Sequence, residues 1–454
     1  MNILLSFYGD DFTGSTDVME ALHFNGVPSA LFLNPPTAEE IRKFRLKTTG
    51  QNLQAFGVAG MSRAMSPQEM EKQLPPVFEA ISQISAAFFH YKICSTFDSA
   101  PTVGNIGTAT DIALRYFPSP FVPMVVGAPV LRRYCVFGNL FAGIDGITYR
   151  IDRHPTMSRH PVTPMNESDL RLHLSKQTSR RVEIADIFSL ENETFVRNPG
   201  FREEGQFILF DTLNETHLTT TGRILFQEKK PQNQLLVGSS GTEYALMAWL
   251  RAVAKLPQPS TLPTVEPSEQ IIVMAGSCSP GTARQIQYAR QQGYEDIRID
   301  TRKLLSEESR GEETRIISEA EKKLSGGKSV VIYSAEGPED QEIENFNREA
   351  ARRGIPPGEA TARIGKAQGK ILKELLLLTH LRRVVVAGGD TSGAVATALG
   401  IYALEAAIPV APGSPLCLAH AHEAAFDGLL IALKGGQVGN EKYFESIRLG
   451  KKLN

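Results

Sequence analysis

Short apolar runs recur along the whole chain, and each leads into glycine, serine, proline or an acidic residue before a stretch with helical spacing begins. The clearest runs cover residues 2–8, 28–33, 53–60, 86–94, 121–129, 270–277, 329–337 and 383–389. Strands buried on both faces of a parallel sheet read as continuous apolar runs, and helices connect them. The pattern therefore predicts an α/β fold with mostly parallel sheets flanked by helices.

A proline-rich segment interrupts this alternation. Residues 255–270 contain four prolines among serine, threonine and other polar residues. Proline lacks a backbone donor and fixes φ, so the segment favours neither a helix nor a central strand. A chain of 454 residues is also too long for one ordinary domain. We expect two α/β domains, residues 1–254 and 271–454, joined by a linker over 255–270, with the active site in the cleft between them.

Charge and cysteine content exclude several classes of protein. Lys+Arg number 48 and Asp+Glu 50, which gives no basic footprint for nucleic acid or for a membrane surface. The four cysteines form no Cys-x-x-Cys pair, so neither a disulfide framework nor a zinc knuckle is expected. The first residues lack the basic start of a signal peptide, and no apolar run reaches the roughly 18 residues that span a bilayer. These features favour a cytoplasmic protein that binds neither nucleic acid nor a membrane.

Polar side chains follow the predicted strands of the first domain, where each strand ends. Asp10 and Asp11 follow the first run, and Arg63 follows the third. The fourth run leads to Lys92, Cys94, Ser95, Thr96, Asp98 and Asn105. Because parallel strands end at one edge of a sheet, these groups suit a pocket for a small, hydroxylated anion. The alternative for each residue is an ordinary polar loop position. The sequence leaves open which aspartate meets a ligand and which caps the next helix, whereas Asp17 is expected to be structural.

Three glycine turns in the second domain could bind phosphate. They occupy residues 276–279, 388–392 and 435–439, and the first two precede a helical stretch. Glycine lets the backbone approach a ligand, and free N–H groups at a helix start attract anions. None of the three turns has the G-x-x-x-x-G-K-[ST] sequence of a Walker A loop. Residues 325–329 (SGGKS) resemble the end of that motif, but they lack its first glycine and precede a strand instead of following one. No G-x-G-x-x-G is present, so each turn could also be a plain strand-to-helix connection.

Histidines and cysteines give weaker indications. Two Arg-His-Pro units, 153–155 and 159–161, lie in a segment over about 130–164 that is expected to be a long irregular excursion. They present cations to an anion or stiffen a packed loop. His420 and His422 have metal-like spacing but no completing cluster, and no metal site is predicted. Cys94 and Cys278 lie at strand ends without a paired base, so a cysteine nucleophile is a minor alternative.

Together these motifs resemble the four-carbon acid sugar kinases over nearly the whole chain and in order. The matching segments are YGDDFTGSTDV, KICSTFDS with GNIG, DRHPTMSRHPVTPM, AGSCSPGTARQI, VVVAGGDTSGAVATALGI and KGGQVG. The resemblance implies an acid-sugar-binding N-terminal domain and an ATP-binding C-terminal domain. It implies a transferase of carbohydrate metabolism that uses ATP with Mg²⁺ to phosphorylate a terminal hydroxyl.

The resemblance also implies roles for individual residues. Asp10 and Asp11 would be catalytic. The sugar acid would contact Asp11, Arg63, Lys92, Cys94, Ser95 and Thr96, and the nucleotide would contact Ser277, Gly388, Gly389, Asp390, Thr391, Gly435 and Gly436. RRYCVFGNLFAG, residues 132–143, departs from the Gly-Arg-Thr-like segment of the threonate and 3-oxo-tetronate enzymes. The resemblance therefore implies threonate, erythronate, 3-oxo-tetronate or a relative such as 3-oxo-isoapionate as the substrate.

Two other functions are kept as alternatives. A two-domain NAD(P)-dependent dehydrogenase would suit the α/β pattern, but the dinucleotide fingerprint is missing. A non-catalytic protein that binds a sugar acid or a partner would not need the aspartates for chemistry. The sequence leaves the oligomeric state open, a homodimer included.

Overall fold

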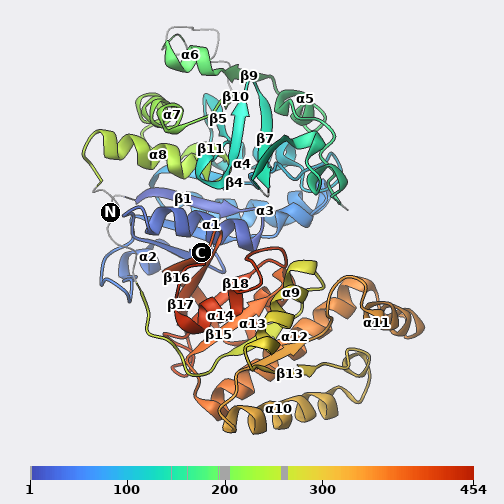
Figure 1. The fold of residues 1–454 in the computed structure, drawn as a ribbon. Coiled ribbons are helices and arrows are strands. Elements are labelled where there is room, and N and C mark those ends of the chain that lie inside the picture. Colours follow the sequence, from blue (N-terminus) through green and yellow to red (C-terminus); the bar gives the residue numbers. More distant parts are fainter. Residues whose placement is uncertain are drawn as a thin grey trace. The chain divides into compact units, whose positions relative to one another are not determined.

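The computed structural model describes residues 3–144, 146–160, 162–192, 194, 205–256 and 264–453. The chain divides into two compact units, Met1–Ser260 and Thr261–Asn454. Unit 1 runs from blue to yellow-green in Figure 1, and unit 2 from yellow to red. Residues 257–263 of the predicted linker lie outside the described residues.

Unit 1 contains a parallel sheet with strand order β2-β3-β1-β4-β11-β5-β10-β9. Its strands are β1 Ile3–Gly9, β2 Ser29–Phe32, β3 Ala55–Ala59, β4 Ala86–Lys92, β5 Phe121–Val125, β9 Val182–Ala185, β10 Gln206–Phe210 and β11 Gln234–Gly238. Most of their residues are buried, as expected for strands covered on both faces.

Helices pack in groups against this sheet. They are α1 Phe12–His23, α2 Ala38–Lys43, α3 Pro67–Ser82, α4 Ile106–Tyr116, α5 Leu170–Leu174, α6 Ile187–Glu191, α7 Glu215–Glu228 and α8 Gly241–Ala252. Helix α8 contacts both α1 and α7, whereas α3 contacts α4 (Figure 1). The prediction of a mostly parallel sheet flanked by helices is confirmed for this unit.

The segment expected to be irregular contains a second, antiparallel sheet, so that expectation was wrong for residues 133–144 and 147–150. Its strands are β6 Arg133–Val136, β7 Asn139–Ile144 and β8 Ile147–Arg150. Phe137 and Gly138 join β6 to β7 with φ of 51° and 77°. A two-residue turn with two left-handed residues matches the twist of a hairpin, but Asn-Gly is its usual signal. Phe-Gly gives no such signal, which is why the hairpin was missed.

Unit 2 has strand order β13-β14-β12-β15-β18-β17-β16, parallel from β13 to β18 and antiparallel beyond. Its strands are β12 Ile272–Ala275, β13 Glu295–Arg298, β14 Val330–Tyr333, β15 Arg383–Ala387, β16 Ile401–Ala411, β17 Ser414–Ala421 and β18 Leu430–Lys434. Its helices are α9 Pro280–Gln291, α10 Ser309–Ser325, α11 Gln341–Arg352, α12 Pro357–Thr379, α13 Gly389–Ala398 and α14 Tyr443–Leu449. The α/β prediction is confirmed here as well.

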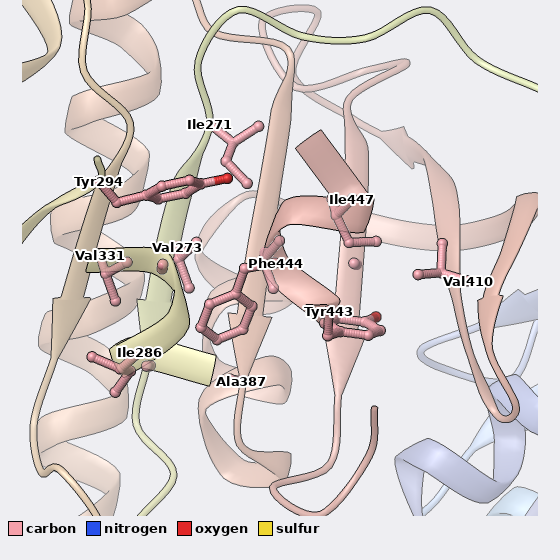
Figure 2. Packing of buried hydrophobic residues seen from close by; sticks show 14 of the residues in the cluster. Ile271, Val273, Ile286, Tyr294, Val331, Ala387, Val410, Tyr443, Phe444 and Ile447 are labelled. Atoms are coloured by element: carbon pink, nitrogen blue, oxygen red, sulfur yellow. The ribbon is translucent and has the colours of Figure 1, made fainter. Parts of the chain in front are cut away.

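An apolar cluster holds the strand ends of unit 2 in place. Phe444 and Ile447 of α14 pack with Ile286 of α9 and Val273 of β12 (Figure 2). Tyr443, also fully buried, donates to the Ser414 carbonyl oxygen at 3.1 Å. The core therefore fixes the turns that follow β12, β15 and β18.

Candidate active site

The strand ends of unit 1 bring the predicted polar residues together. Gly9 at the end of β1 is in register with Ala59 of β3 and Lys92 of β4. The Asp10 N–H donates to the Lys92 carbonyl oxygen, and the Arg63 N–H donates to that of Asp10, each at 2.9 Å. Residues separated by up to 83 positions thus share one edge of the sheet.

Asp10, Asp11 and Arg63 form one hydrogen-bonded cluster. Arg63 donates to Asp10 from Nε at 3.0 Å and from Nη2 at 2.7 Å. Its Nη1 donates to Asp11 Oδ2 at 2.7 Å. Burial raises the pKa of Asp10, although the Arg63 charge opposes this shift. Burial alone would lower the pKa of Arg63, but Asp10 raises it well above its usual value. Arg63 therefore stays charged and hydrogen-bonded to both aspartates.

The two aspartates differ in position. The Asp10 side chain is 4% exposed and that of Asp11 29%. Asp11 is also the N-cap of α1, because its Oδ1 accepts from the Gly14 N–H at 2.7 Å. A Cβ on Gly14 would lie 2.5 Å from that oxygen and 3.2 Å from Lys92 Nζ. Sequence reasoning missed the role of Gly14 in leaving room for these two groups. A glycine in the first turn of a predicted helix, directly after the two aspartates, could have indicated it.

Lys92 is buried and paired with Asp17. Its Nζ lies 3.3 Å from Asp17 Oδ2, with 2% of the lysine side chain exposed. Burial alone would lower the pKa of Lys92, but the carboxylates of Asp17 and Asp10 raise it above its usual value. Asp17, expected from the sequence to be structural, thus lies at this edge of the sheet as the ion-pair partner of Lys92.

The loop after β4 supplies a chain of polar contacts. Thr96 Oγ1 lies 2.9 Å from Cys94 Sγ and donates to Asp98 Oδ1 at 2.5 Å. Ser95 between them is half-buried. Burial raises the pKa of Cys94 to about 11, so the thiol stays protonated near neutral pH and is a poor nucleophile. Asn105 instead caps α4, accepting from the Thr108 N–H at 2.7 Å.

In unit 2 the three glycine turns lie side by side. Ala275 pairs with Ala387, and Ala387 with Lys434, so β12, β15 and β18 end together. The Gly276 N–H donates to the Ala387 carbonyl oxygen and the Gly388 N–H to that of Lys434, each at 2.9 Å. A Cβ on Gly276 would lie 1.9 Å from Thr391 Oγ1, so this approach requires glycine.

Serine hydroxyls join the first turn to the third. Ser279 caps α9, accepting from the Thr282 N–H at 3.1 Å, and donates to the Gly436 carbonyl oxygen at 2.5 Å. A Cβ on Gly436 would lie 2.3 Å from Ser277 Oγ. Gly435, one residue earlier, is half-buried. Ser277, Gly435 and Gly436 therefore occupy one small region.

The start of α13 is open to an anion. Its N-cap Gly388 has φ of 129° and provides no side-chain cap. Gly389 and Asp390 are exposed, and a Cβ on Gly389 would have nothing within 4 Å. Thr391 Oγ1 instead donates inward to Gln368 Oε1 at 3.1 Å. Uncapped N–H groups at a helix start suit a phosphate group.

Lys434 was missed by sequence reasoning. It is 1% exposed, and its Nζ donates to Thr282 Oγ1 at 3.1 Å and to the Gly436 carbonyl oxygen at 3.3 Å. Among the described residues no carboxylate oxygen lies within 4 Å of this nitrogen. Burial lowers the pKa of Lys434 to about 7. The sequence pattern that could have indicated Lys434 is a lysine at the end of an apolar run, directly before two glycines.

The histidine motifs stabilise turns. His154 Nδ1 accepts from the N–H groups of Thr156 and Met157 at 3.2 Å, and His160 Nδ1 accepts from that of Thr163 at 3.0 Å. These contacts agree with a packed loop, although Pro161 lies outside the described residues.

The metal-like spacing of His420 and His422 is not completed into a metal cluster among the described residues. His420 lies 3.6 Å from Glu405. Within the described ranges no group of three or more His, Cys, Asp and Glu residues could hold a metal ion. The same ranges contain no helix long and apolar enough to cross a membrane.

Comparisons with known proteins place the chain in a family. A model described as a sugar-binding N-terminal domain matches residues 5–246, and one described as a nucleotide-binding C-terminal domain matches 272–444. The chain is 44% identical over 452 residues to the 3-oxo-isoapionate kinase of Paraburkholderia graminis, covering 99% of this chain and 95% of that one. The chain belongs to the four-carbon acid sugar kinase family. The resemblance expected from its motifs is confirmed.

More distant relatives and solved structures also match along nearly their whole length. The 3-oxo-tetronate kinase of Pectobacterium atrosepticum is 27% identical, covering 97% of this chain and 98% of that one. A solved structure from Salmonella typhimurium LT2 is 25% identical, with a TM-score of 0.73 and 98% coverage of both chains. A Haemophilus influenzae structure matches with a TM-score of 0.67 at 21% identity, covering 98% of this chain and 99% of that one, and supports the fold alone.

Proposed function

We propose that this protein is an ATP-dependent kinase that phosphorylates a terminal hydroxyl of a small sugar acid. The observation that carries the proposal is the Asp10–Asp11–Arg63 cluster, at the strand ends of the unit that matches a sugar-binding domain. The first candidate substrate is 3-oxo-isoapionate, because the relative named 3-oxo-isoapionate kinase is 44% identical to this chain. The 3-oxo-tetronate kinase of Pectobacterium atrosepticum is only 27% identical. Threonate, erythronate and 3-oxo-tetronate are the further candidates.

Asp11 is the better placed of the two aspartates to accept the proton of the reacting hydroxyl. Its side chain is 29% exposed, whereas that of Asp10 is 4% exposed and held by two bonds from Arg63. A general base must come within hydrogen-bond reach of the proton it removes. In this mechanism Asp10 and Arg63 hold the Asp11 carboxylate in position. Lys92, Cys94, Ser95 and Thr96 contribute polar groups for the remaining oxygens of the sugar acid.

The converging turns of unit 2 bind the nucleotide phosphates in this mechanism. The start of α13, residues Gly388 to Thr391, offers uncapped N–H groups. Ser277 and the Gly435–Gly436 turn lie beside the Lys434 ammonium, which has no carboxylate partner among the described residues. Phosphoryl transfer depends mainly on positioning and on charge stabilisation, which such groups supply.

Mg²⁺ fits this site as a companion of the nucleotide. Mg²⁺ is usually held by one or two carboxylates together with substrate phosphates and water. Asp390 places an exposed carboxylate in the first turn of α13 and so could supply one oxygen ligand. Bound there, the ion would neutralise phosphate charge during transfer.

The direct test is a kinase assay on the purified full chain. ATP and Mg²⁺ are combined with threonate, erythronate, 3-oxo-tetronate or 3-oxo-isoapionate, and ADP release is measured. We expect turnover with at least one acid, and turnover about 10²- to 10⁴-fold slower with the same acid for Asp11→Asn. If no acid causes ADP release at high enzyme concentration, the proposal is wrong.

A further inference from the structure

The hairpin that sequence reasoning missed is fixed at the carboxyl edge of the unit 1 sheet. Asp211, directly after β10, accepts from the N–H groups of Phe137 at 2.5 Å and Gly138 at 3.0 Å. Cys135 and Thr212 exchange backbone hydrogen bonds of 3.0 and 2.7 Å. Strand β6 is therefore held against the ends of the sheet strands rather than free in solution.

This anchoring places Arg133, the first residue of β6, beside the candidate site. Its backbone exchanges hydrogen bonds of 2.9 and 3.1 Å with Ala128, three residues after the end of β5. Its side chain interacts electrostatically with Cys94 and Asp98 of the loop that follows β4. A residue outside the parallel sheet thus joins the groups at its edge.

Arg133 differs from the two other cations near Cys94. Cys94 also interacts electrostatically with Arg63 and Lys92. Arg63 is bonded to two aspartates and Lys92 is paired with Asp17. Among the described residues no carboxylate oxygen lies within 4 Å of the Arg133 guanidinium. Arg133 is therefore the cation of this group without a paired carboxylate.

The hydrogen bonds of Arg133 leave much of its guanidinium unused. Nη1 donates to the carbonyl oxygens of Leu131 at 3.0 Å and Gly143 at 3.2 Å. Nε is buried and has no hydrogen-bond partner. Burial lowers the pKa of Arg133, and Cys94 and Asp98 only partly oppose this shift. A partly buried guanidinium without a counter-charge is costly, and a carboxylate that accepts two parallel bonds would stabilise it.

His154 adds a neutral donor beside this cation. Its Nδ1 accepts two backbone N–H bonds, so the neutral ring carries its proton on Nε2. Burial, together with the Arg133 charge, lowers the pKa of His154 and keeps the ring neutral near pH 7. His154 therefore adds no charge to that of Arg133, whose other cationic neighbour is the adjacent Arg132, and the Arg133 guanidinium remains the anion-binding group.

We propose that Arg133 binds the carboxylate of the sugar acid and makes the enzyme select acids over neutral analogues. The inference rests on the proposed function and deepens it: Asp11 acts on the hydroxyl end, and Arg133 holds the acid end. Arg63 and Lys92 remain in the site, but their charges are already balanced by the protein.

The test compares the acid and its primary amide in wild type and in Arg133→Met. The probe is whichever of threonate, erythronate, 3-oxo-tetronate and 3-oxo-isoapionate the wild type phosphorylates. A hydrogen-bonded charge pair contributes about 1.5–3 kcal/mol, so we expect KM for the acid to rise about 10- to 100-fold. KM for ATP is expected to stay unchanged. The preference for acid over amide should largely disappear, a result that a structural role alone would not give.

Two further variants make the result decisive. Arg133→Lys keeps a charge but loses the planar guanidinium, so its preference for acid over amide should fall between that of the wild type and that of Arg133→Met. If Arg133→Met does not fold, Arg133→Lys takes its place in the comparison. Arg150→Met removes an exposed arginine of the same small sheet that is paired with Asp152, and should keep the wild-type preference. An unchanged preference in both Arg133 variants overturns the inference.

Failure of the proposed function gives a different result. In that case the wild type phosphorylates no acid of the panel, and the same comparison is made by thermal shift with acid and amide. A shift by acid alone, lost in Arg133→Met, keeps the carboxylate site and removes the kinase. A shift by neither acid nor amide in the wild type overturns both.

Discussion

The Arg63 guanidinium donates to both oxygens of Asp10, at 3.0 and 2.7 Å, where only 4% of the Asp10 side chain is exposed. Removing one partner of a buried pair leaves the other charge without compensation, which costs far more than the pair contributes when intact. The contact therefore fixes the site and makes it sensitive to conservative changes.

Arg63→Lys is expected to destabilise unit 1 by about 1–3 kcal/mol, because a lysine cannot satisfy Asp10 and Asp11 together. Urea unfolding followed by Trp249, the only tryptophan of the chain, measures this change. Arg115→Lys is the matched control, since Arg115 also forms two bonds, to an exposed Glu71. Exposed pairs contribute about 0–1 kcal/mol, so an equal loss in both variants would contradict the prediction.

Asp11→Asn should separate catalysis from folding. Asparagine caps helices as well as aspartate, so α1 should keep its cap on Gly14. It cannot accept the hydroxyl proton, and kcat is expected to fall about 10²- to 10⁴-fold. The amide also loses the partly exposed bond from Arg63 Nη1, so Tm should fall modestly while the protein stays folded at the assay temperature. Asp186→Asn is the control, because Asp186 caps α6 in the same way, at 2.7 Å from the Ser189 nitrogen. Full activity in Asp11→Asn would exclude it as the base.

The open space at Gly389 tests the nucleotide site. Neither Gly389 nor Gly393 of α13 has an atom within 4 Å of an added Cβ, so alanine should not harm folding at either position. Gly389 lies at the helix start where the phosphate is proposed, and Gly393 does not. We expect Gly389→Ala to raise the Kd for ADP at least about tenfold, or about 1.4 kcal/mol, by blocking close approach.

Isothermal titration calorimetry with ADP measures both Kd values, and Tm checks folding. Gly393→Ala should bind ADP like the wild type. If both variants bind ADP equally well, the phosphate does not lie over Gly389.

Parallel-sheet topology explains what the sequence could predict. Asp10, Arg63 and Lys92 could be placed at one edge because each follows an apolar run, and parallel strands end together. The same topology applies to the glycine turns after Ala275 and Ala387, which follow neighbouring parallel strands. In both cases a local pattern determined a long-range contact.

What sequence reasoning missed depends on contacts without a local signal. The hairpin turn at Phe137 and Gly138 lacks the usual residues, and its anchoring by Asp211 joins positions 73 and 74 residues apart. Arg133 and Lys434 stand out because each is at least partly buried and has no carboxylate partner among the described residues. Neither property can be read from a single basic residue in a sequence.

The buried Lys434 should give unit 2 a pH-dependent stability. Its pKa is about 7 when folded, against a usual value of 10.5. Below about pH 7 the amine is charged in both states, and folding carries the full cost of burying the charge. Between about pH 7 and 10.5 the folded state has released the proton while the unfolded state retains it, so stability rises with pH. The rise is about 1.4 kcal/mol per pH unit at most.

Lys434→Met removes this dependence. The free energy of unfolding of the variant should exceed that of the wild type most clearly at pH 6.5. The loss of the hydrogen bonds to Thr282 and Gly436 reduces this gain by a constant amount. The gain should shrink steadily toward pH 9.5. Denaturant unfolding by circular dichroism at three pH values measures the difference, and Lys451→Met, at an exposed position of unit 2, is the control. A difference between Lys434→Met and wild type that stays constant from pH 6.5 to 9.5 would show that Lys434 keeps its proton in the folded protein, held there by an anion or a carboxylate.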